Sequence, residues 1–454
     1  MRTTVIGTGY VGLVTGTSLA YFGHPVTCVD TNPSIVERLS NRELTIYENG
    51  LEEIFNKAVD SRNLSFTTKL DEALVGADLV IIAVGTPFDG KRIDLKYIKQ
   101  VAKEIGEWLK ANDQFLVVTI KSTVIPGTTS KTAKIIIEEV SGKKEGVDFC
   151  MAMNPEFLRE GCAVKDFMEP DRIVLGCSHE YGLKRLHEIY ENFNCPKIET
   201  TPTTAEMIKY TANSLFANMI SFSNEISNIC EEIGSVDVEE VFQGVYFDKR
   251  LMPRTEGQER IKPELLTYLK AGCGFGGSCF PKDVKALASF AEDSGLDSPM
   301  LRSVLSINSM RHQRVVKVVN DKLGGLNGKT ITILGLAFKP ETDDIRESAS
   351  IRIIRELLNA DVDIKAYDPI VKPSNLTHQG ADDVVNKINI CTTKEEAMRN
   401  SDAILILTAW DEFLQINNEQ LNSLDKKPFL FDGRRILKRE SFTDGQYLGI
   451  GFKS

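Results

Sequence analysis

Short apolar runs alternate with helix-compatible stretches from the first residues onward. The chain opens with such a run over residues 3–6, continues with a helix-compatible stretch up to Tyr21, and has a second run over residues 26–29. Two more apolar runs, within residues 76–87 and 114–129, end in Thr, Pro and Gly. Continuous apolar runs are typical of strands buried on both faces, and their alternation with helices indicates a parallel sheet. The first part of the chain therefore predicts a doubly wound α/β domain.

Residues 202–234 predict a single long helix. Pro202 and a cap at Thr203/Thr204 mark its start, and Gly234 marks its end. At 1.5 Å per residue, about 30 residues span on the order of 45 Å. Because this is long for a globular helix, we expect it to bridge domains or to form a subunit interface.

The N-terminal pattern returns after the glycine-rich segment 320–329. "KTITILGLAFK", "VDIKAYDP" and "NSDAILILTAW" follow one another in the order of the first strands, which predicts a second doubly wound domain. We therefore expect an α/β protein with two Rossmann-like doubly wound domains, joined by a long central helix and a helical region. The predicted domains are residues 1–202, 203–319 and 320–454.

Composition narrows the possible partners. The 454 residues are 42% hydrophobic and 26% charged, as in ordinary globular proteins. A net charge of −10 argues against nucleic acid or an anionic membrane as the main partner. No signal peptide or membrane-spanning run is evident. The nine cysteines form no C-x-x-C pair, so neither a disulfide framework nor a metal site is indicated, and we expect a cytoplasmic protein.

A glycine fingerprint follows the first predicted strand. Gly7 permits a tight turn, Gly9 lets a pyrophosphate approach the backbone, and Gly12 lets helix and strand pack closely. Asp30 ends the second strand, where a carboxylate accepts hydrogen bonds from an adenosine ribose. A carboxylate there repels a 2′-phosphate, and no cation occupies the next two positions. The pattern favours NAD over NADP as the cofactor.

Thr86 and Thr123 end the later apolar runs of the same domain. Ligands of doubly wound sheets bind at the carboxyl ends of the strands, so both threonines are candidate cofactor contacts. Each alone is more often a turn residue.

The segment GCGFGGSCFPKD, residues 272–283, places four glycines and a serine before Cys279. Pro281 is typical of a first helical turn, so we expect Cys279 at a helix N-terminus, which stabilises a thiolate. The glycines would let a substrate approach the backbone, with amides open to an oxyanion or a phosphate. Asp283 follows one turn later, in reach of an attacking water. The alternative is a flexible turn with a cysteine packed as a small hydrophobe.

NAD together with a reactive thiol supports a four-electron oxidation. The thiol traps an aldehyde as a thiohemiacetal, a second hydride transfer gives a thioester, and water releases an acid. Lys209 and Asn213 share one face of the long helix with Glu206 beside them, although a solvated polar stripe is an equal alternative. In the last domain the fingerprint is broken after Gly335, and cations at strand ends or early loops indicate a different anionic ligand, ordinary surface cations being the alternative. These cations are Lys339, Arg346, Arg434 and Arg435.

Seven motifs carry a family resemblance. "GTGYVGL", "STVIPGTT", "NPEFLREG", "AEMIKYTAN", "GFGGSCFPKD", "ILGLAFKPETDDIRES" and "DGRR" occur in this order over nearly the whole chain. In this respect the chain resembles the UDP-glucose 6-dehydrogenases. The resemblance implies an NAD-dependent enzyme that acts on a nucleotide sugar and forms a homodimer.

The same resemblance implies roles for individual residues. Its catalytic set comprises Cys279 as nucleophile, Lys209 and Asn213 at the oxyanion, Asp283 and Lys209 for water activation, Glu156 as acid/base, and Thr123 to position the water. Its cofactor contacts are Gly7, Gly9, Tyr10, Val11, Gly12, Asp30, Thr86, Thr123, Glu160 and Arg346. Its substrate contacts are Glu156, Phe157, Leu158, Arg159, Lys209, Asn213, Arg260, Tyr268, Lys270 to Gly276 with Phe275, Lys339 and Arg434.

Two positions depart from the family pattern. Ile35 stands where relatives commonly have Lys or Arg near the adenosine, so the expectation for adenosine contacts does not carry over from the family at this position. Arg260 is the candidate for an arginine donated across a dimer, but its spacing to Cys279 is about three residues longer than in relatives.

Other functions are weighed against this one. The same chemistry could act on GDP-mannose or a UDP-N-acetylhexosamine. A non-catalytic nucleotide-sugar or NAD binding protein would be expected to lack Cys279, Lys209 or Asp283, and all three are present. A single-step dehydrogenase of the β-hydroxyacid type would need no nucleophilic thiol.

Overall fold

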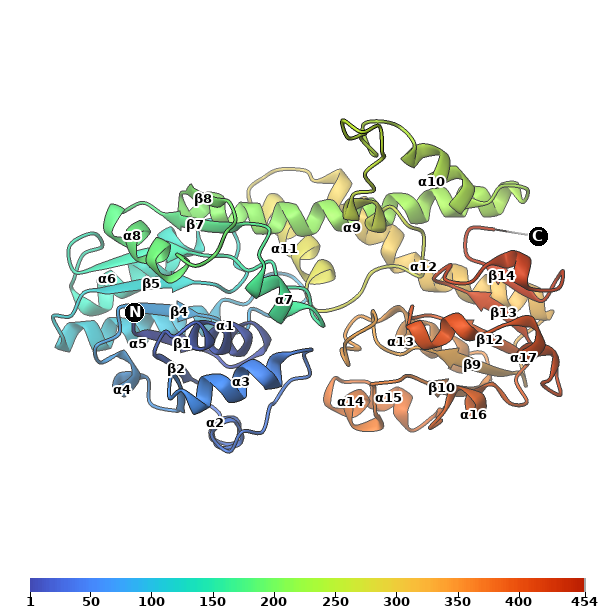
Figure 1. Cartoon of the computed structure of the whole chain (residues 1–454), viewed down its shortest axis with the longest axis horizontal. Coiled ribbons are helices and arrows are strands. Elements are labelled where there is room, and N and C mark those ends of the chain that lie inside the picture. Colours follow the sequence, from blue (N-terminus) through green and yellow to red (C-terminus); the bar gives the residue numbers. More distant parts are fainter. Residues whose placement is uncertain (453–454) are drawn as a thin grey trace. The chain divides into compact units, whose positions relative to one another are not determined.

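The computed structural model describes residues 1–452. It contains two compact units, Met1–Ala212 and Asn213–Ser454, and their boundary falls inside the long helix. Each unit holds one doubly wound sheet, and a long helical region separates the two sheets along the chain (Figure 1). The predicted α/β class with two Rossmann-like halves is confirmed. The division into three domains stays a prediction.

The first unit is built on an eight-stranded sheet of order β3-β2-β1-β4-β5-β6-β7-β8. All neighbours are parallel except β6 and β7, which pair antiparallel. The strands are β1 (Thr3–Ile6), β2 (Val26–Val29), β3 (Leu64–Thr67), β4 (Leu79–Ile82), β5 (Leu116–Ile120), β6 (Phe149–Met153), β7 (Ile173–Cys177) and β8 (Lys197–Thr200). The four strands predicted from apolar runs in this unit are β1, β2, β4 and β5.

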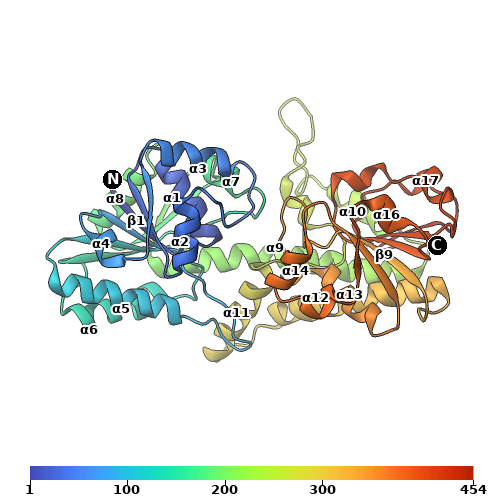
Figure 2. The same ribbon diagram turned by 90° about the horizontal axis from the view of Figure 1, so that it is seen from below.

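Helices cover both faces of this sheet because its strands are apolar on both faces. Alternate residues of β4 enter different cores: Ile81 packs with α1 and α3, whereas Ile82 packs with α5 and α6. Figure 2 shows α1 to α3 on one side of the sheet and α5 and α6 on the other. The helices are α1 (Tyr10–Tyr21), α2 (Pro33–Ser40), α3 (Leu51–Asp60), α4 (Leu70–Leu74), α5 (Lys96–Ala111), α6 (Lys134–Ser141), α7 (Ala163–Met168) and α8 (Glu180–Ile189), with a π-helical turn η1 (Thr128–Ala133) before α6.

The long helix α9 runs from Pro202 to Ile233, within one residue of its predicted end. Its predicted cap at Thr203/Thr204 is wrong, because both residues lie inside the helix. Thr201 takes this role instead: its hydroxyl accepts a hydrogen bond from the Thr204 backbone N–H at 3.2 Å.

The second unit holds a six-stranded, all-parallel sheet of order β11-β10-β9-β12-β13-β14. The three segments predicted to repeat the N-terminal strands form β9, β10 and β12. The strands are β9 (Thr330–Leu334), β10 (Asp363–Tyr367), β11 (Asn389–Ile390), β12 (Ala403–Ile406), β13 (Phe429–Asp432) and β14 (Tyr447–Gly449).

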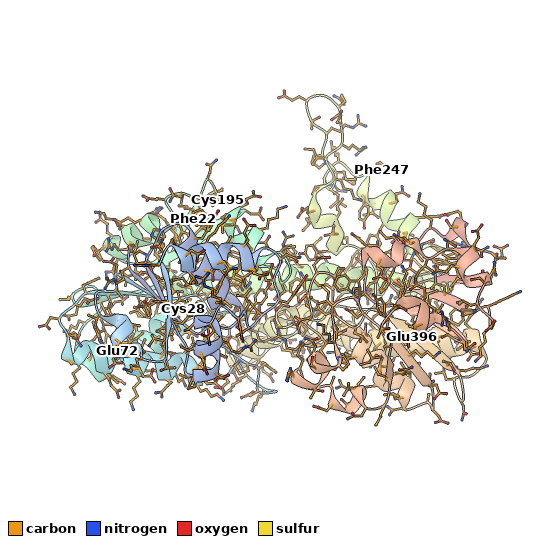
Figure 3. All side chains as sticks on the ribbon, turned by 60° about the horizontal axis from the view of Figure 1, so that its bottom comes forward. Phe22, Cys28, Glu72, Cys195, Phe247 and Glu396 are labelled. Carbon is orange, nitrogen blue, oxygen red and sulfur yellow. The ribbon has the colours of Figure 1, made fainter. Side chains whose placement is uncertain are left out.

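The second unit contains further helices of the helical region and helices that alternate with the strands of this sheet along the chain. They are α10 (Val238–Tyr246), η2 (Glu264–Tyr268), α11 (Phe280–Asp293), α12 (Pro299–Leu323), α13 (Ala349–Leu358), α14 (Pro373–His378), α15 (Asp382–Val385), α16 (Lys394–Met398), η3 (Asp411–Gln415), α17 (Asn418–Asn422) and η4 (Arg439–Ser441). Between α10 and η2 the chain forms a long loop, and Phe247 lies at its base (Figure 3).

The two sheets share one turn design. Gly335 follows β9 with φ +95°, as Gly7 follows β1 with φ +96°. Asp368 follows β10, and its carboxylate accepts hydrogen bonds from the Leu336 and Ala337 backbone N–H groups and from the Trp410 indole. The acid that ends the second strand is thus retained in both halves, but in the second half it is buried and bonded to the protein itself.

Two features concern metals and membranes. Over the described residues 1–452, no group of three or more His, Cys, Asp or Glu side chains could hold a metal ion. Within the same range, no helix has both the length and the apolar character that crossing a bilayer requires.

Candidate active site

The glycine turn after β1 is shaped by close packing at two positions and open at a third. A Cβ on Gly12 would lie 1.8 Å from the Gly7 carbonyl oxygen, and one on Gly7 would lie 2.8 Å from the Ala83 carbonyl oxygen. A Cβ on Gly9 would meet nothing within 4 Å. Gly9 heads α1, where the first N–H groups of a helix bind anions. The turn therefore fits a dinucleotide pyrophosphate above Gly9.

Asp30 is tied to this turn. Its Oδ2 accepts hydrogen bonds from the Thr8 backbone N–H at 3.0 Å and from the Thr8 hydroxyl at 2.7 Å. Its Oδ1 accepts one from the Asn32 backbone N–H. Asp30 is only partly buried, so the carboxylate keeps an exposed side for a ribose. Ile35 packs its side chain against the apolar core around α1.

A buried glutamate links Tyr10 to the segment after Phe157. Glu48 bonds to the Tyr10 hydroxyl, and it accepts hydrogen bonds from the Gly161 and Ala163 backbone N–H groups at 2.7 and 2.8 Å. The sequence alone did not identify Glu48, because no recognisable motif includes it. It joins the glycine turn to the loop that carries Glu160. The neighbouring Val11 packs against the same core as Ile35.

The threonines at the strand ends come together. Thr86 donates a hydrogen bond from its hydroxyl to the Thr123 carbonyl oxygen at 2.8 Å. Because β4 and β5 are parallel neighbours, both residues lie at the same edge of the sheet. The structure thus brings together two residues that the sequence analysis treated as separate candidates.

Glu156 and Lys209 form a buried ion pair. The Lys209 Nζ lies 2.9 Å from the Glu156 Oε1, and the side chains are 4% and 6% exposed. Glu156 Oε2 also accepts a hydrogen bond from the Leu158 backbone N–H at 2.6 Å. The central carbon of the Arg172 guanidinium lies 3.8 Å from the centroid of the Phe157 ring, and the Lys209 Nζ lies 5.5 Å from the same centroid. The segment after β6 and the N-terminal part of α9 therefore present one carboxylate and one ammonium group as a fixed pair.

A second buried lysine interacts electrostatically with this pair. Lys121, directly after β5, donates hydrogen bonds to the Asn154 Oδ1 at 2.9 Å and to the Tyr190 hydroxyl at 3.4 Å. Burial lowers the pKa of Lys121 to about 8, the negative charge of Glu156 opposes that shift, and the positive charge of Lys209 adds to it. The sequence signal was a lysine inside an otherwise apolar run, and we had not singled it out.

Glu206 anchors α9 to the segment that follows Thr123. Its carboxylate accepts hydrogen bonds from the Gly127 N–H, the Thr129 N–H and the Thr129 hydroxyl, at 2.5, 2.7 and 2.6 Å. Glu206 is fully buried, so the predicted solvated stripe is excluded at this position. Burial raises the pKa of Glu206, and its three hydrogen bonds oppose that shift.

In the second unit, Cys279 is the N-cap of α11, as predicted. Its Sγ lies 3.6 Å from the Ser278 Oγ, and its carbonyl oxygen accepts a hydrogen bond from the Asp283 backbone N–H. Cys279 is partly exposed, whereas the neighbouring Cys273 is buried. The alternative of a buried structural cysteine therefore fits Cys273 but not Cys279.

Asp283 is held between two donors. Its Oδ2 accepts a hydrogen bond from the Asn213 Nδ2 and its Oδ1 one from the Lys282 Nζ, both at 2.6 Å. Asp283 is 1% exposed. Two donors to one buried carboxylate fix its direction. Lys282 is a further functional candidate that the sequence analysis passed over.

The glycines of the cysteine loop make room for protein rather than only for substrate. A Cβ on Gly276 would lie 2.4 Å from the Glu347 carbonyl oxygen, and one on Gly277 would lie 2.8 Å from the Phe338 ring. The Gly277 N–H donates to the Arg346 carbonyl oxygen at 2.9 Å. The expectation that the loop amides stand open to a ligand is therefore wrong at Gly277.

The remaining predicted substrate contacts of this unit lie around the same loop. Tyr268 stacks on Phe216 at 4.4 Å between centroids, and Phe275 meets Phe280 edge-on at 6.1 Å. Lys270 donates to the Arg435 carbonyl oxygen at 3.0 Å. Arg434 donates to the Leu407 carbonyl oxygen, and a Cβ on Gly272 would lie 3.4 Å from its guanidinium.

Three predicted residues are engaged elsewhere. Arg260 donates to the carbonyl oxygens of Phe247 and Met252 at 2.7 and 3.2 Å, which closes the base of the loop between α10 and η2. Arg159 forms an ion pair with Asp166, and Arg346 forms one with Asp344. Lys339 lies beside the Phe338 ring, 5.7 Å from its centroid.

Three family models match consecutive parts of the chain. The NAD binding domain of the UDP-glucose/GDP-mannose dehydrogenase family matches residues 1–194, its central domain residues 203–310, and its UDP binding domain residues 332–439. The NAD assignment thus agrees with the open position at Gly9.

Individual proteins are similar over their full length. The UDP-glucose 6-dehydrogenase YwqF of Bacillus subtilis is 41% identical over 458 residues, covering 100% of this chain and 98% of the relative. The UDP-glucose dehydrogenase structure from Pyrobaculum islandicum has a TM-score of 0.87 at 36% identity, covering 99% of this chain and 97% of that one. The UDP-D-ManNAc dehydrogenase structure from Pyrococcus horikoshii has a TM-score of 0.84 at 27% identity, covering 99% of each chain. The chain therefore belongs to the UDP-glucose/GDP-mannose dehydrogenase family.

Proposed function

We propose that the protein oxidises UDP-glucose to UDP-glucuronate and reduces two NAD molecules in each turnover. The observation that carries this function is the full-length similarity to UDP-glucose 6-dehydrogenases at about 40% identity, together with the retained thiol at the start of α11. The residue roles below are part of the proposal.

NAD, held by the glycine turn and Asp30, supplies the hydride acceptor for both oxidation steps. Cys279 attacks the aldehyde that the first oxidation gives, and the resulting thiohemiacetal carries the carbon through the second oxidation to a thioester. The position of Cys279 at the N-terminus of α11 supports this role, because such a position stabilises the thiolate.

Lys209 and Asn213 are the proposed donors to the oxyanion that develops at this carbon. Glu156 and Asp283 are the proposed carboxylates for the hydrolysis step, in which water attacks the thioester carbon and releases the Cys279 sulfur. The pairing of Glu156 with Lys209 at 2.9 Å supports this role, because it fixes the direction of the carboxylate. Thr123 is the proposed residue that positions the water.

The decisive experiment measures NADH formed per UDP-glucose consumed at completion, with GDP-mannose in parallel. Two NADH from UDP-glucose alone are expected. One NADH contradicts the thioester step, and oxidation of GDP-mannose alone overturns the substrate. Cys279→Ala should form no UDP-glucuronate, whereas Cys195→Ala, which removes another partly exposed cysteine, should leave the stoichiometry unchanged.

We also propose a homodimer formed through α9. Leu215, Phe222 and Ile229 follow one another at seven-residue spacing and are 51%, 49% and 51% exposed. Residues seven apart share a face of a helix, and large apolar side chains in such a row are typical of subunit interfaces. Phe222→Asp should convert the dimer to a monomer in light scattering. The proposed compartment is the cytoplasm, because a nucleophilic thiol must stay reduced.

A further inference from the structure

The cysteine loop makes few hydrogen bonds with its own backbone. Gly272 donates its N–H to the Asn224 Oδ1 at 2.8 Å, and its carbonyl oxygen accepts from the Arg311 Nε at 2.7 Å. Phe275 donates its N–H to the Asn308 Oδ1 at 2.8 Å, and its carbonyl oxygen accepts from the Asn308 Nδ2 at 3.0 Å. Buried backbone groups need partners, and here side chains of α9 and α12 supply all four.

The Asn308 side-chain amide pairs with the backbone of Phe275 as another peptide group would. It both accepts from and donates to Phe275, so it fixes the position and the direction of that peptide. The backbone is shaped to admit it: Gly274 has φ +104°, and a Cβ there would lie 2.6 Å from the Asn308 Oδ1. Only glycine combines this backbone conformation with that space.

Arg311, one turn later on α12, secures the other end of the loop. It is 1% exposed, and besides the Gly272 carbonyl oxygen it donates to the Ser227 hydroxyl at 2.8 Å and to Asn228 Oδ1. The guanidinium thereby binds α9, α12 and the loop together. Asn308 and Arg311 share a face of α12, so one rigid helix holds both anchors.

Phe275 connects the anchored loop to the first turn of α11, next to Cys279. Its side chain belongs to a buried cluster with Val284 of α11 and Val304 of α12, and its ring meets Phe280, the first residue of α11. The two glycines between Phe275 and Ser278 offer no side chains that could hold the segment. Besides the Gly277 N–H bond to the Arg346 carbonyl oxygen and the Asn213 bond to Asp283, the contacts of Phe275 therefore help to set the position of the first turn of α11, with Cys279 at its head.

We propose that Asn308 is a positioning residue for Cys279, acting through the peptide and the ring of Phe275. This proposal rests on the proposed function only for the role of Cys279 in turnover. The accessibility and reactivity of the thiol can be measured without any substrate.

The test compares Asn308→Ala with the wild type in two measurements. The first is the second-order rate at which iodoacetamide alkylates Cys279 at neutral pH, followed by mass spectrometry of the peptide that contains it. The second is the steady-state kinetics with UDP-glucose and NAD. We expect the alkylation rate to change about tenfold and kcat to fall about tenfold or more, since a small misplacement of a reacting group is costly, with KM for NAD unchanged.

Ser221→Ala is the matched control. The Ser221 hydroxyl donates to the Val304 carbonyl oxygen at 3.2 Å, so this variant removes a buried hydrogen bond between α9 and α12 without touching the loop. It should leave both measurements unchanged. An Asn308→Ala protein that loses thermal stability but keeps the wild-type alkylation rate and kcat overturns the proposal.

A second variant tests the proposal if the Asn308→Ala protein does not fold. Asn308→Asp keeps the oxygen that accepts from the Phe275 N–H but loses the donor to the Phe275 carbonyl oxygen, and it should move alkylation and kcat in the same directions by less. Unchanged values in that variant also overturn the proposal. Loss of UDP-glucose turnover in the wild type, with the alkylation difference preserved, would contradict the proposed function and not the role of Asn308.

Discussion

Glu156 and Lys209 form an ion pair of 2.9 Å in which neither side chain is more than 6% exposed. Removing either charge leaves the other buried and uncompensated. Glu156→Gln keeps the shape and an oxygen for the Lys209 ammonium but cannot accept a proton. We expect kcat to fall about 10²-fold or more, because a lost general base costs that order. Rapid mixing should still show NADH from the first turnover, since hydrolysis comes after both hydride transfers.

Glu139→Gln is the control for this prediction. Glu139 is an exposed carboxylate on α6 in the same unit, and its replacement should not affect turnover. Loss of the first-turnover NADH in Glu156→Gln would contradict a role confined to hydrolysis.

The fold could be predicted from sequence where one segment carries the whole signal. The apolar runs, the glycine fingerprint and the length of α9 are all local, and each agrees with the structure. The antiparallel junction of β6 and β7 could not be predicted in this way, because strand direction depends on which segment fills the next place in the sheet. The cap of α9 was misplaced by two residues, because several adjacent threonines could serve equally.

The glycine turn offers a test that separates binding from folding. Gly9→Ala introduces a Cβ into open space, at a φ of −68° that alanine tolerates. We expect an unchanged melting temperature and a KM for NAD raised about tenfold or more, because the added methyl occupies the path of the pyrophosphate.

Gly12→Ala should behave in the opposite way. Its Cβ would lie 1.8 Å from the Gly7 carbonyl oxygen, so the α1–β1 packing must open. We expect a loss of about 2 kcal/mol or more in the free energy of unfolding, of the order of overpacking in a core. Equal melting temperatures for the two variants would show that the close approach at Gly12 is not a constraint.

The groups that sequence reasoning missed share one property. Glu48, Asn308 and Lys121 all act on segments distant in the chain, and nothing beside them in sequence marks their partners. Motifs reveal residues whose chemistry is read locally, such as Cys279 before Pro281. Residues that hold a loop or share a buried charge become visible only when the tertiary contacts are known.

Replacing the Asp283 carboxylate by an amide tests its proposed role in turnover and its contribution to stability. In Asp283→Asn an amide replaces the acceptor of the Asn213 and Lys282 hydrogen bonds, so a donor must face a donor on one side. We expect kcat to fall about 10²-fold and the protein to lose about 1–3 kcal/mol of stability.

The double variant Asp283→Asn with Asn213→Asp separates these effects. It restores one donor and one acceptor between α9 and α11, so denaturant unfolding should show stability recovered in large part. Activity should stay low, because the carboxylate has moved from α11 to α9. Recovery of both would show that Asp283 has only a structural role.

The lowered pKa of Lys121 predicts how the free energy of unfolding changes with pH. Its pKa is lowered from 10.5 to about 8 by burial in the folded protein, so between these pH values the unfolded chain binds more protons. Stability contributed by this group therefore rises with pH from about 8 to 10.5, and below about 8 both states are protonated and the contribution is flat. Lys121→Met removes the titrating group. The difference in unfolding free energy, wild type minus variant, should increase by about 3 kcal/mol across this window. Urea unfolding at several pH values measures it, and a difference that stays constant or falls with pH would show that Lys121 keeps an ordinary pKa when folded.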